Sequence, residues 1–140
     1  MAGDLAGAVQ LYQASLAEQP TAEAHTFLGW VYSFERRYEE AIAECKRAIA
    51  VDPSFGNPYN DIGCYLMELG REEEAIPWLQ RAMEAPRYEA PHFPHVNLAR
   101  IYEQKGQVLA AVAEYGRALD KLPGYGPAVV GLRRLQARVN

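Results

Sequence analysis

Several classes of protein are disfavoured by what this chain lacks. It has two cysteines in 140 residues, Cys45 and Cys64, and their spacing matches neither a zinc pattern nor a CxxC motif. We expect reduced thiols packed as small hydrophobic residues, with a structural disulfide as the alternative. No apolar run approaches the roughly 20 residues that span a bilayer, and the N-terminal residues lack the basic-then-apolar order of a secretory signal. The sequence therefore predicts no direct membrane insertion and favours a cytoplasmic location.

An excess of positive charge is also missing. The chain carries 14 Lys and Arg against 18 Asp and Glu, which gives a net charge of -4. Nucleic acids and anionic membrane surfaces attract basic patches, so neither is an expected partner. The composition, 49% hydrophobic and 23% charged, is that of an ordinary folded protein.

Recognisable catalytic and metal-binding patterns are absent. We find no nucleophile with a base and an orienting group, no phosphate-cradling glycine loop and no calcium loop. His92 and His95 stand three residues apart, but Pro94 separates them and no third ligand is evident. His25 and His95 are better explained as packing or surface residues. We therefore expect no enzymatic activity, no cofactor and no metal.

What the sequence does contain is a repeat. Three similar segments cover residues 22–53, 56–87 and 92–123, and a half-copy covers 3–20. Small residues recur at matching places in these copies: Ala8, Ala41, Ala75 and Ala111, followed by Ser15, Ala48, Ala82 and Ala118. Such correlated positions at a fixed period are typical of repeat architectures.

Each copy contains two runs with helical spacing, joined by a short polar turn. Small residues at Gly29, Gly63 and Ala99 allow two helices to approach closely, and a larger side chain there would overpack. Pro53 and Pro123 end their helices because proline cannot continue the hydrogen-bond ladder. The predicted helices are 4–18, 22–35, 38–51, 56–69, 72–85, 92–105, 108–121 and 126–138.

These residues resemble the tetratricopeptide repeat (TPR), a helix–turn–helix of 34 residues. The first match contains Leu28-Gly29, Tyr32, Ala41, Cys45, Ala48 and Pro53; the second contains Tyr59, Ile62-Gly63, Leu66, Ala75, Leu79 and Ala82; the third contains Leu98-Ala99, Tyr102, Ala111, Tyr115, Ala118 and Pro123. The resemblance implies an all-α fold, a right-handed α-α superhelix (TPR solenoid) of antiparallel helix pairs with a C-terminal capping helix. It implies one array over 1–140: a half-repeat (second helix only) at 1–20, repeats at 21–54, 55–91 and 92–125, and the capping helix at 126–140.

The resemblance further implies a protein–protein interaction scaffold that binds a partner peptide or helix in a concave groove. Carried onto this sequence, the groove residues are Thr26, Trp30, Phe34, Asn57, Asn60, Cys64, Met67, Phe93, Val96, Arg100 and Gln104. Trp30 is the main expected anchor, because exposed aromatic residues dominate binding energies; packing between repeats is the alternative. The lysines with which co-chaperone TPR domains hold a terminal carboxylate are missing here, which argues against acidic chaperone tails.

Three local departures complete the prediction. Pro77, inside a helix, is expected to bend it. The join at 85–94 holds three prolines and is either a silent insertion or a rigid lip that presents Tyr88 and Phe93. The apolar face of the first helix (Val9, Leu11, Tyr12, Leu16) lacks a partner helix. This face suggests two alternatives: the chain is a fragment of a longer array, or it is a self-associating module that forms a homodimer through the N-terminal helix. A regulatory fragment of a larger protein is a further alternative for the function.

Overall fold

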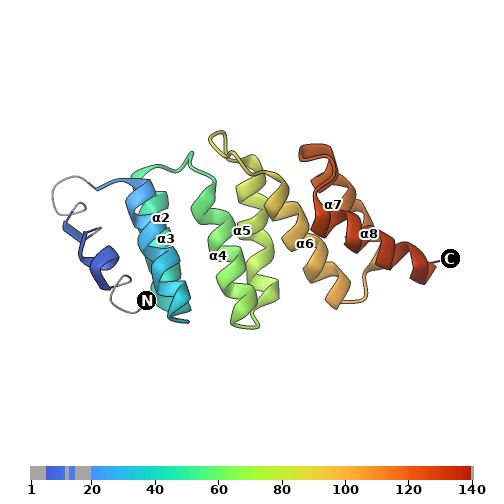
Figure 1. The fold of residues 1–140 in the computed structure, drawn as a ribbon, viewed down its shortest axis with the longest axis horizontal. Coiled ribbons are helices and arrows are strands. Elements are labelled where there is room, and N and C mark those ends of the chain that lie inside the picture. Colours follow the sequence, from blue (N-terminus) through green and yellow to red (C-terminus); the bar gives the residue numbers. More distant parts are fainter. Residues whose placement is uncertain (1–5, 12, 15–19, 140) are drawn as a thin grey trace. The chain divides into compact units, whose positions relative to one another are not determined.

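The computed structural model describes residues 6–11, 13–14 and 20–139, and their regular structure is helical. Seven helices are delimited: α2 (Ala22–Phe34), α3 (Tyr38–Val51), α4 (Asn57–Glu68), α5 (Glu72–Glu84), α6 (His92–Gln104), α7 (Val108–Lys121) and α8 (Gly126–Val139). Each bound lies within a residue of the predicted one (Figure 1). Residues 6–11 and 13–14 are helical as well, and the remainder of the predicted helix 4–18 lies outside the described residues.

The chain divides into two compact units, Met1–Tyr88 and Glu89–Asn140. In the first unit α2 packs on α3, α3 on α4 and α4 on α5, and α2 also contacts α4. In the second unit α6 packs on α7, and α7 on α8. Successive helices therefore form the antiparallel pairs that the repeat predicts (Figure 1).

Small residues set the distance between paired helices, as expected. A Cβ added to Gly63 of α4 would lie 2.4 Å from Leu79 Cδ2 of α5, and one added to Gly29 of α2 would lie 3.0 Å from the Ala41 carbonyl oxygen of α3. Ala41 and Ala48 of α3 have no exposed surface. The two helices of a pair thus meet through hydrogen atoms and methyl groups, and larger side chains there would separate them.

The turn inside each repeat closes in the same way. Gly70 and Gly106 have φ values of 74° and 75°, and Arg36 occupies the corresponding place with a φ of 60°. The amide of the following residue then donates to a carbonyl five residues back, as in Arg71 to Leu66 at 2.8 Å. This is the Schellman pattern that ends helices with a left-handed residue. Arginine pays a steric penalty in that conformation, whereas glycine does not.

In two of the repeats, a His, a Glu and an Arg side chain at equivalent positions form contacts between the two helices of the pair. In α2–α3, His25 Nδ1 lies 2.8 Å from Glu44 Oε2, and Arg47 donates to Glu44 Oε1 at 2.6 Å. The last repeat repeats this arrangement with the equivalent residues His95, Glu114 and Arg117.

In the middle repeat, a cation–π contact takes the place of this His–Glu–Arg contact. There the equivalent residues are Tyr59, Trp78 and Arg81, and the Arg81 guanidinium lies 4.7 Å from the Trp78 ring centre and 5.0 Å from that of Tyr59. An ion pair and a cation–π stack therefore occupy the same place in the fold. These contacts explain His25 and His95 as packing residues, as the sequence predicted.

The last helix completes the second unit. Ala128 and Leu135 of α8 are fully buried in a core with Tyr115 of α7. On the other side of α8, Arg134 donates twice to the Glu103 carboxylate of α6, at 2.7 and 2.8 Å. Beside the buried stripe, Arg133, Arg134 and Arg138 of α8 are exposed, as is Val130; the role of α8 as a capping helix stays a prediction.

Three further expectations concern single residues or segments. Pro77 is exposed inside α5, which continues as one helix from Glu72 to Glu84, and the expected bend stays a prediction. Both cysteines are free thiols, Cys45 buried and Cys64 half-buried. None of the described helices combines the length and the apolar character that crossing a bilayer demands.

Candidate functional site

An edge of aromatic side chains runs along α2. Phe27 and Trp30 meet edge to face with their ring centres 5.4 Å apart, and Trp30 and Phe34 do the same at 4.7 Å. Their spacing of three and four residues places them on one helix face. Trp30 is 48% exposed and Phe34 58% exposed. So much accessible aromatic surface on one face is typical of a protein-binding site.

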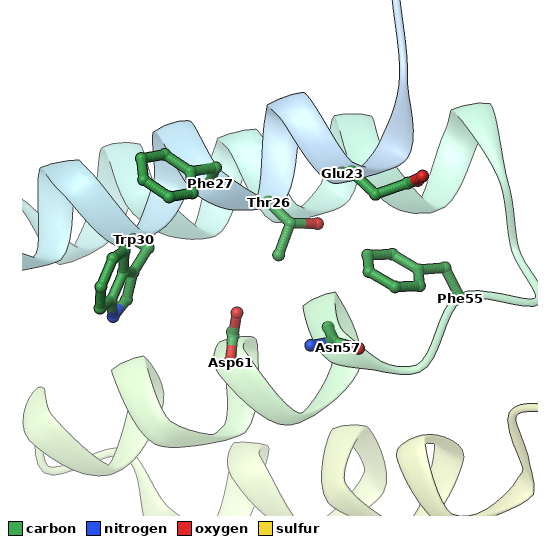
Figure 2. A pocket seen from close by; sticks show the side chains of 7 residues that line it. All are labelled: Glu23, Thr26, Phe27, Trp30, Phe55, Asn57 and Asp61. Atoms are coloured by element: carbon green, nitrogen blue, oxygen red, sulfur yellow. The ribbon is translucent and has the colours of Figure 1, made fainter. Parts of the chain in front are cut away.

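A hollow of about 330 Å³ adjoins this edge, between α2 and α4 (Figure 2). Its lining comes from α2, α4 and the α3–α4 loop: Glu23, Thr26, Phe27, Trp30, Phe55, Asn57 and Asp61. Figure 2 shows the Asp61 carboxyl group rising from α4 toward α2, with Trp30 on one side and Asn57 and Phe55 on the other. The hollow has the volume of a small ligand site, and aromatic side chains and carboxylates share its walls.

Asp61 is the unusual member of this lining. Its side chain is half-buried, and desolvation raises the pKa of its carboxyl group to about 7. Among the described residues it has no hydrogen bond or ion pair that would offset this burial. Buried carboxylates are costly unless they are paired. The hollow therefore contains an acidic group whose hydrogen-bonding and charge requirements the chain itself leaves unmet.

Groups from several elements surround Asp61. Its negative charge adds to burial in raising the pKa of Tyr65 on α4, of Tyr88 after α5 and of the Cys45 thiol on α3. The Cys64 thiol lies near the same tyrosines and belongs to this cluster. None of these neighbours is a cation. The local field therefore favours a positive charge beside Asp61.

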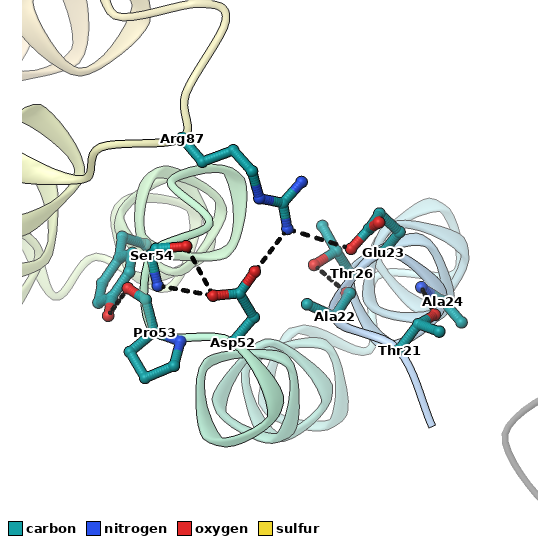
Figure 3. A network of polar contacts seen from close by, with 10 residues as sticks. Thr21, Ala22, Glu23, Ala24, Thr26, Asp52, Pro53, Ser54 and Arg87 are labelled. Carbon is teal, nitrogen blue, oxygen red and sulfur yellow. Dashed lines mark hydrogen bonds and ion pairs between the residues drawn. The ribbon is translucent and has the colours of Figure 1, made fainter. Parts of the chain in front are cut away.

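The segment that follows α5 closes one end of the hollow. Gly56 donates from its amide to the Arg87 carbonyl at 2.9 Å, and Arg87 donates to the Ser54 carbonyl at 3.0 Å. The Arg87 side chain reaches Asp52 at 2.7 Å and Glu23 at 3.3 Å (Figure 3). Its guanidinium also lies 4.2 Å from the ring centre of Phe55. This end of the hollow is thus held by both backbone and charged contacts.

Tyr88 has a different role from the one its sequence position suggested. A Cβ added to Gly56 would lie 2.5 Å from Tyr88 Cβ, so the tyrosine packs directly on that glycine. Its half-buried ring fixes the join against α4 rather than standing out from it. Tyr88 is therefore not presented to a partner as the rigid-lip alternative expected, and the choice between a silent insertion and a rigid lip stays a prediction.

The structure distributes the predicted groove residues of the first unit over three environments. Thr26, Trp30 and Asn57 line the hollow, and Phe34 extends its aromatic edge. Asn60 is only 6% exposed. The others, Cys64 and Met67, are half-buried on α4.

In the second unit α6 carries the remaining groove residues. Phe93, Arg100 and Gln104 are exposed, and Phe93 packs edge to face on Tyr125 with ring centres 6.0 Å apart. Val96 is only 2% exposed and belongs to the core of this unit. Val96 and Asn60 offer a partner almost no surface, because packing within their own unit covers them, and we leave them out of the proposed surface.

Sequence reasoning missed three residues of the hollow as site residues: Phe27, Phe55 and Asp61. Phe27 lies on α2 but outside the predicted groove positions, and Phe55 lies in a loop outside the repeat pattern. Asp61 did leave a signal. Phe27, Asp61 and Asn97 occupy the same position in successive repeats. The middle repeat therefore has an acidic residue where the first has an aromatic residue and the third has an amide. Within the part of the chain that the structure describes, no group of His, Cys, Asp and Glu has the arrangement of a metal site.

Comparison with known families identifies the repeat. Tetratricopeptide-repeat models match residues 22–55, 57–88 and 95–120. The chain belongs to the tetratricopeptide-repeat family, and the predicted all-α TPR superhelix is confirmed. Proteins of this family are generally protein–protein interaction scaffolds and typically have no enzymatic activity.

Individual relatives support the fold. The small glutamine-rich tetratricopeptide repeat-containing protein 2 of Mycosarcoma maydis is 28% identical over 85 residues, which are 59% of this chain but only 24% of the relative. The chain thus spans about a quarter of that protein. The solved structure of Pseudomonas aeruginosa pilF is similar with a TM-score of 0.89, 23% identity, and coverage of 98% of this chain and 62% of its own.

YrrB, described as a TPR protein with an unusual peptide-binding site, has a TM-score of 0.72 and 22% identity. The likeness covers 99% of this chain and 71% of YrrB. At these identities the solved structures establish the fold alone.

Proposed function

We propose that this chain binds a peptide segment of a partner protein in the hollow between α2 and α4. The observation that carries the proposal is the pairing of a hollow of about 330 Å³ with the exposed Trp30 at its edge. Burying exposed aromatic surface contributes much of the energy of peptide recognition. The peptide-binding site in the description of YrrB, which shares the fold, is consistent with this use.

The hollow has features suited to a peptide rather than to a reaction. The Asn57 amide can both donate to and accept from a peptide backbone. Thr26 already satisfies its hydroxyl by donating to the Ala22 carbonyl at 2.7 Å, so it contributes mainly a methyl wall. No described side chain at the hollow is paired as a nucleophile with a base. We therefore propose a binding function without catalysis.

A peptide-library selection on the immobilised protein tests this function. The wild type should enrich a peptide family, and Trp30→Ala should weaken the binding of its members by at least about tenfold, because one buried aromatic anchor contributes 2 kcal/mol or more. Leu109→Ala is the matched control, since Leu109 is a 78% exposed apolar residue on α7. Both variants should keep the wild-type helicity. Failure to enrich any peptide, or equal binding by Trp30→Ala, would refute the proposal.

Self-association through the first helical segment is a second candidate. The observation in its favour is Leu11, which is 69% exposed. Val9 of the same segment faces Tyr32 of α2 across a separate hollow, and Tyr12 and Leu16 lie outside the described residues. Light scattering over a range of concentrations decides this. A dimer that Leu11→Asp dissociates would establish self-association, and a monomer at every concentration excludes it.

A further inference from the structure

The hollow between α2 and α4 contains an acid without a partner, and this feature suggests what the partner peptide contributes. Asp61 is half-buried, directed into the hollow and without a hydrogen bond or ion pair among the described residues. The neighbouring Trp30 offers its ring at the same opening. A carboxylate beside an aromatic face is the usual environment of a bound cation.

A cation of the chain itself contacts two residues that line this hollow, Phe55 and Glu23. The Arg87 guanidinium lies over Phe55 and contacts Glu23 and Asp52, so an arginine satisfies the acids at that end. Figure 3 shows this side chain between the two carboxylates, with dashed lines to both. Asp61 lies beyond Phe55 and Asn57 (Figure 2), and no ion pair with it is found among the described residues. The contacts of Arg87 thus give an example, within this molecule, of the cationic partner that Asp61 lacks among the described residues.

We infer that the hollow receives a lysine or arginine side chain of the partner peptide, with its charge on Asp61 and its aliphatic stem along Trp30. This inference rests on the proposed peptide-binding function and specifies the chemistry of its partner. The cation would replace water at a carboxylate that has no other counterion, so charge complementarity favours a basic segment over an acidic one. Phe34, next to Trp30, offers a surface for an apolar residue that flanks the basic one.

Burial supports this assignment independently of shape. Burial raises the pKa of Asp61 to about 7, so ionising the carboxyl group costs the folded chain stability. A group that served only the fold would be replaced by an asparagine or an apolar residue without loss. A positive charge from a partner removes that cost, because the opposite charge stabilises the ionised carboxylate.

The test is the sequence content of selected peptides together with one charge-neutral variant. Peptides enriched from a random library on the wild type should carry lysine or arginine at a fixed position. Asp61→Asn should weaken these peptides by about tenfold or more, as loss of a charge-assisted contact does. The same peptides with glutamine in place of the basic residue should bind the wild type weakly and should not distinguish the wild type from Asp61→Asn.

Asp120→Asn is the matched control, because it removes an identical charge from an exposed position on α7. It should bind like the wild type, which separates a local contact from a change in net charge. Peptides that require Trp30 but carry no fixed basic residue would overturn the inference and leave the proposed function standing. Equal affinity of Asp61→Asn and wild type for a basic peptide would overturn it as well. A wild type that enriches no peptide would refute both.

Discussion

Two glycines inside helices should respond to the same substitution with opposite signs. Gly63 of α4 and Gly116 of α7 both occupy helix interiors, where alanine is favoured over glycine by about 1 kcal/mol. A Cβ on Gly116 would meet nothing within 4 Å, whereas a Cβ on Gly63 would lie 2.4 Å from Leu79 Cδ2 and 2.6 Å from Leu79 Cγ. Only the helix-propensity gain therefore applies to Gly116, and overpacking opposes it at Gly63.

The magnitudes decide the net effect at Gly63. Ordinary carbon contacts begin near 3.4 Å, so the overlap there is about 1 Å, and Leu79 is fully buried and cannot swing into solvent. Overpacking in a closed core costs roughly 1–3 kcal/mol. After the propensity gain, Gly63→Ala should lower the free energy of unfolding by about 1–2 kcal/mol. Gly116→Ala should raise it by up to about 1 kcal/mol.

Urea unfolding followed by far-ultraviolet circular dichroism measures both changes. For a chain of this size, each kcal/mol also shifts the melting midpoint by roughly 2–4 °C. A double-mutant cycle isolates the contact: in a Leu79→Ala background, where the opposing side chain is removed, Gly63→Ala should become neutral or stabilising. A stable Gly63→Ala single variant would refute the close approach of α4 and α5, and a destabilised Gly116→Ala would refute the open face of α7.

Three other predictions concern backbone strain and titration. Arg36→Gly should raise the free energy of unfolding by about 0.5–1 kcal/mol, because the residue has a φ of 60°; Gly70→Ala, at the equivalent turn, should lower stability, and melting curves compare the two. Burial opposes a low pKa at Glu114, but bonds from His95 and an arginine outweigh it and hold the pKa below its usual value. The stabilisation from these bonds is therefore present above about pH 4.5 and is lost as the pH falls through the lowered pKa. The stability difference between wild type and Glu114→Gln should shrink on acidification, and a constant difference would contradict the ion pair. Burial instead raises the pKa of Asp61 to about 7, so the free energy of unfolding of the wild type should fall from about pH 4 to pH 7. Asp61→Asn should therefore melt at a higher temperature than the wild type near pH 8 but not near pH 4. A lower melting midpoint of Asp61→Asn at both pH values would mean that Asp61 supports the fold.

Local chemistry explains why the helices could be predicted so closely. Helical periodicity, a proline after α3 and small residues at repeated places are all properties of short segments. Gly70 and Gly106 mark their turns because few other residues adopt a left-handed backbone. Arg36 fills the third equivalent turn without being glycine, and there the repeat register alone located the turn.

The candidate site was only partly predictable, because its members come from separate elements. Register predicted Trp30 and Asn57 as groove residues, and both line the hollow, since each lies on the first helix of its repeat. Phe55 belongs to a loop that the periodicity does not describe, and it meets the hollow only because the loop turns back toward α2. Register also pointed to Val96, which the second unit buries in its core. Equivalent repeat positions thus differ in exposure because the residues packed around them differ.

By itself, then, the sequence determined the family and the helix pairs, because a repeated pattern of apolar and small residues permits one economical way of burying itself. The tertiary structure decided which polar groups have partners. Asp52 and Glu23 both bind Arg87, a residue far from either in the chain, whereas Asp61 lies near tyrosines and thiols and has no cationic partner among the described residues. Burial and charge pairing depend on every group within a few ångströms, and only the folded chain brings those groups together.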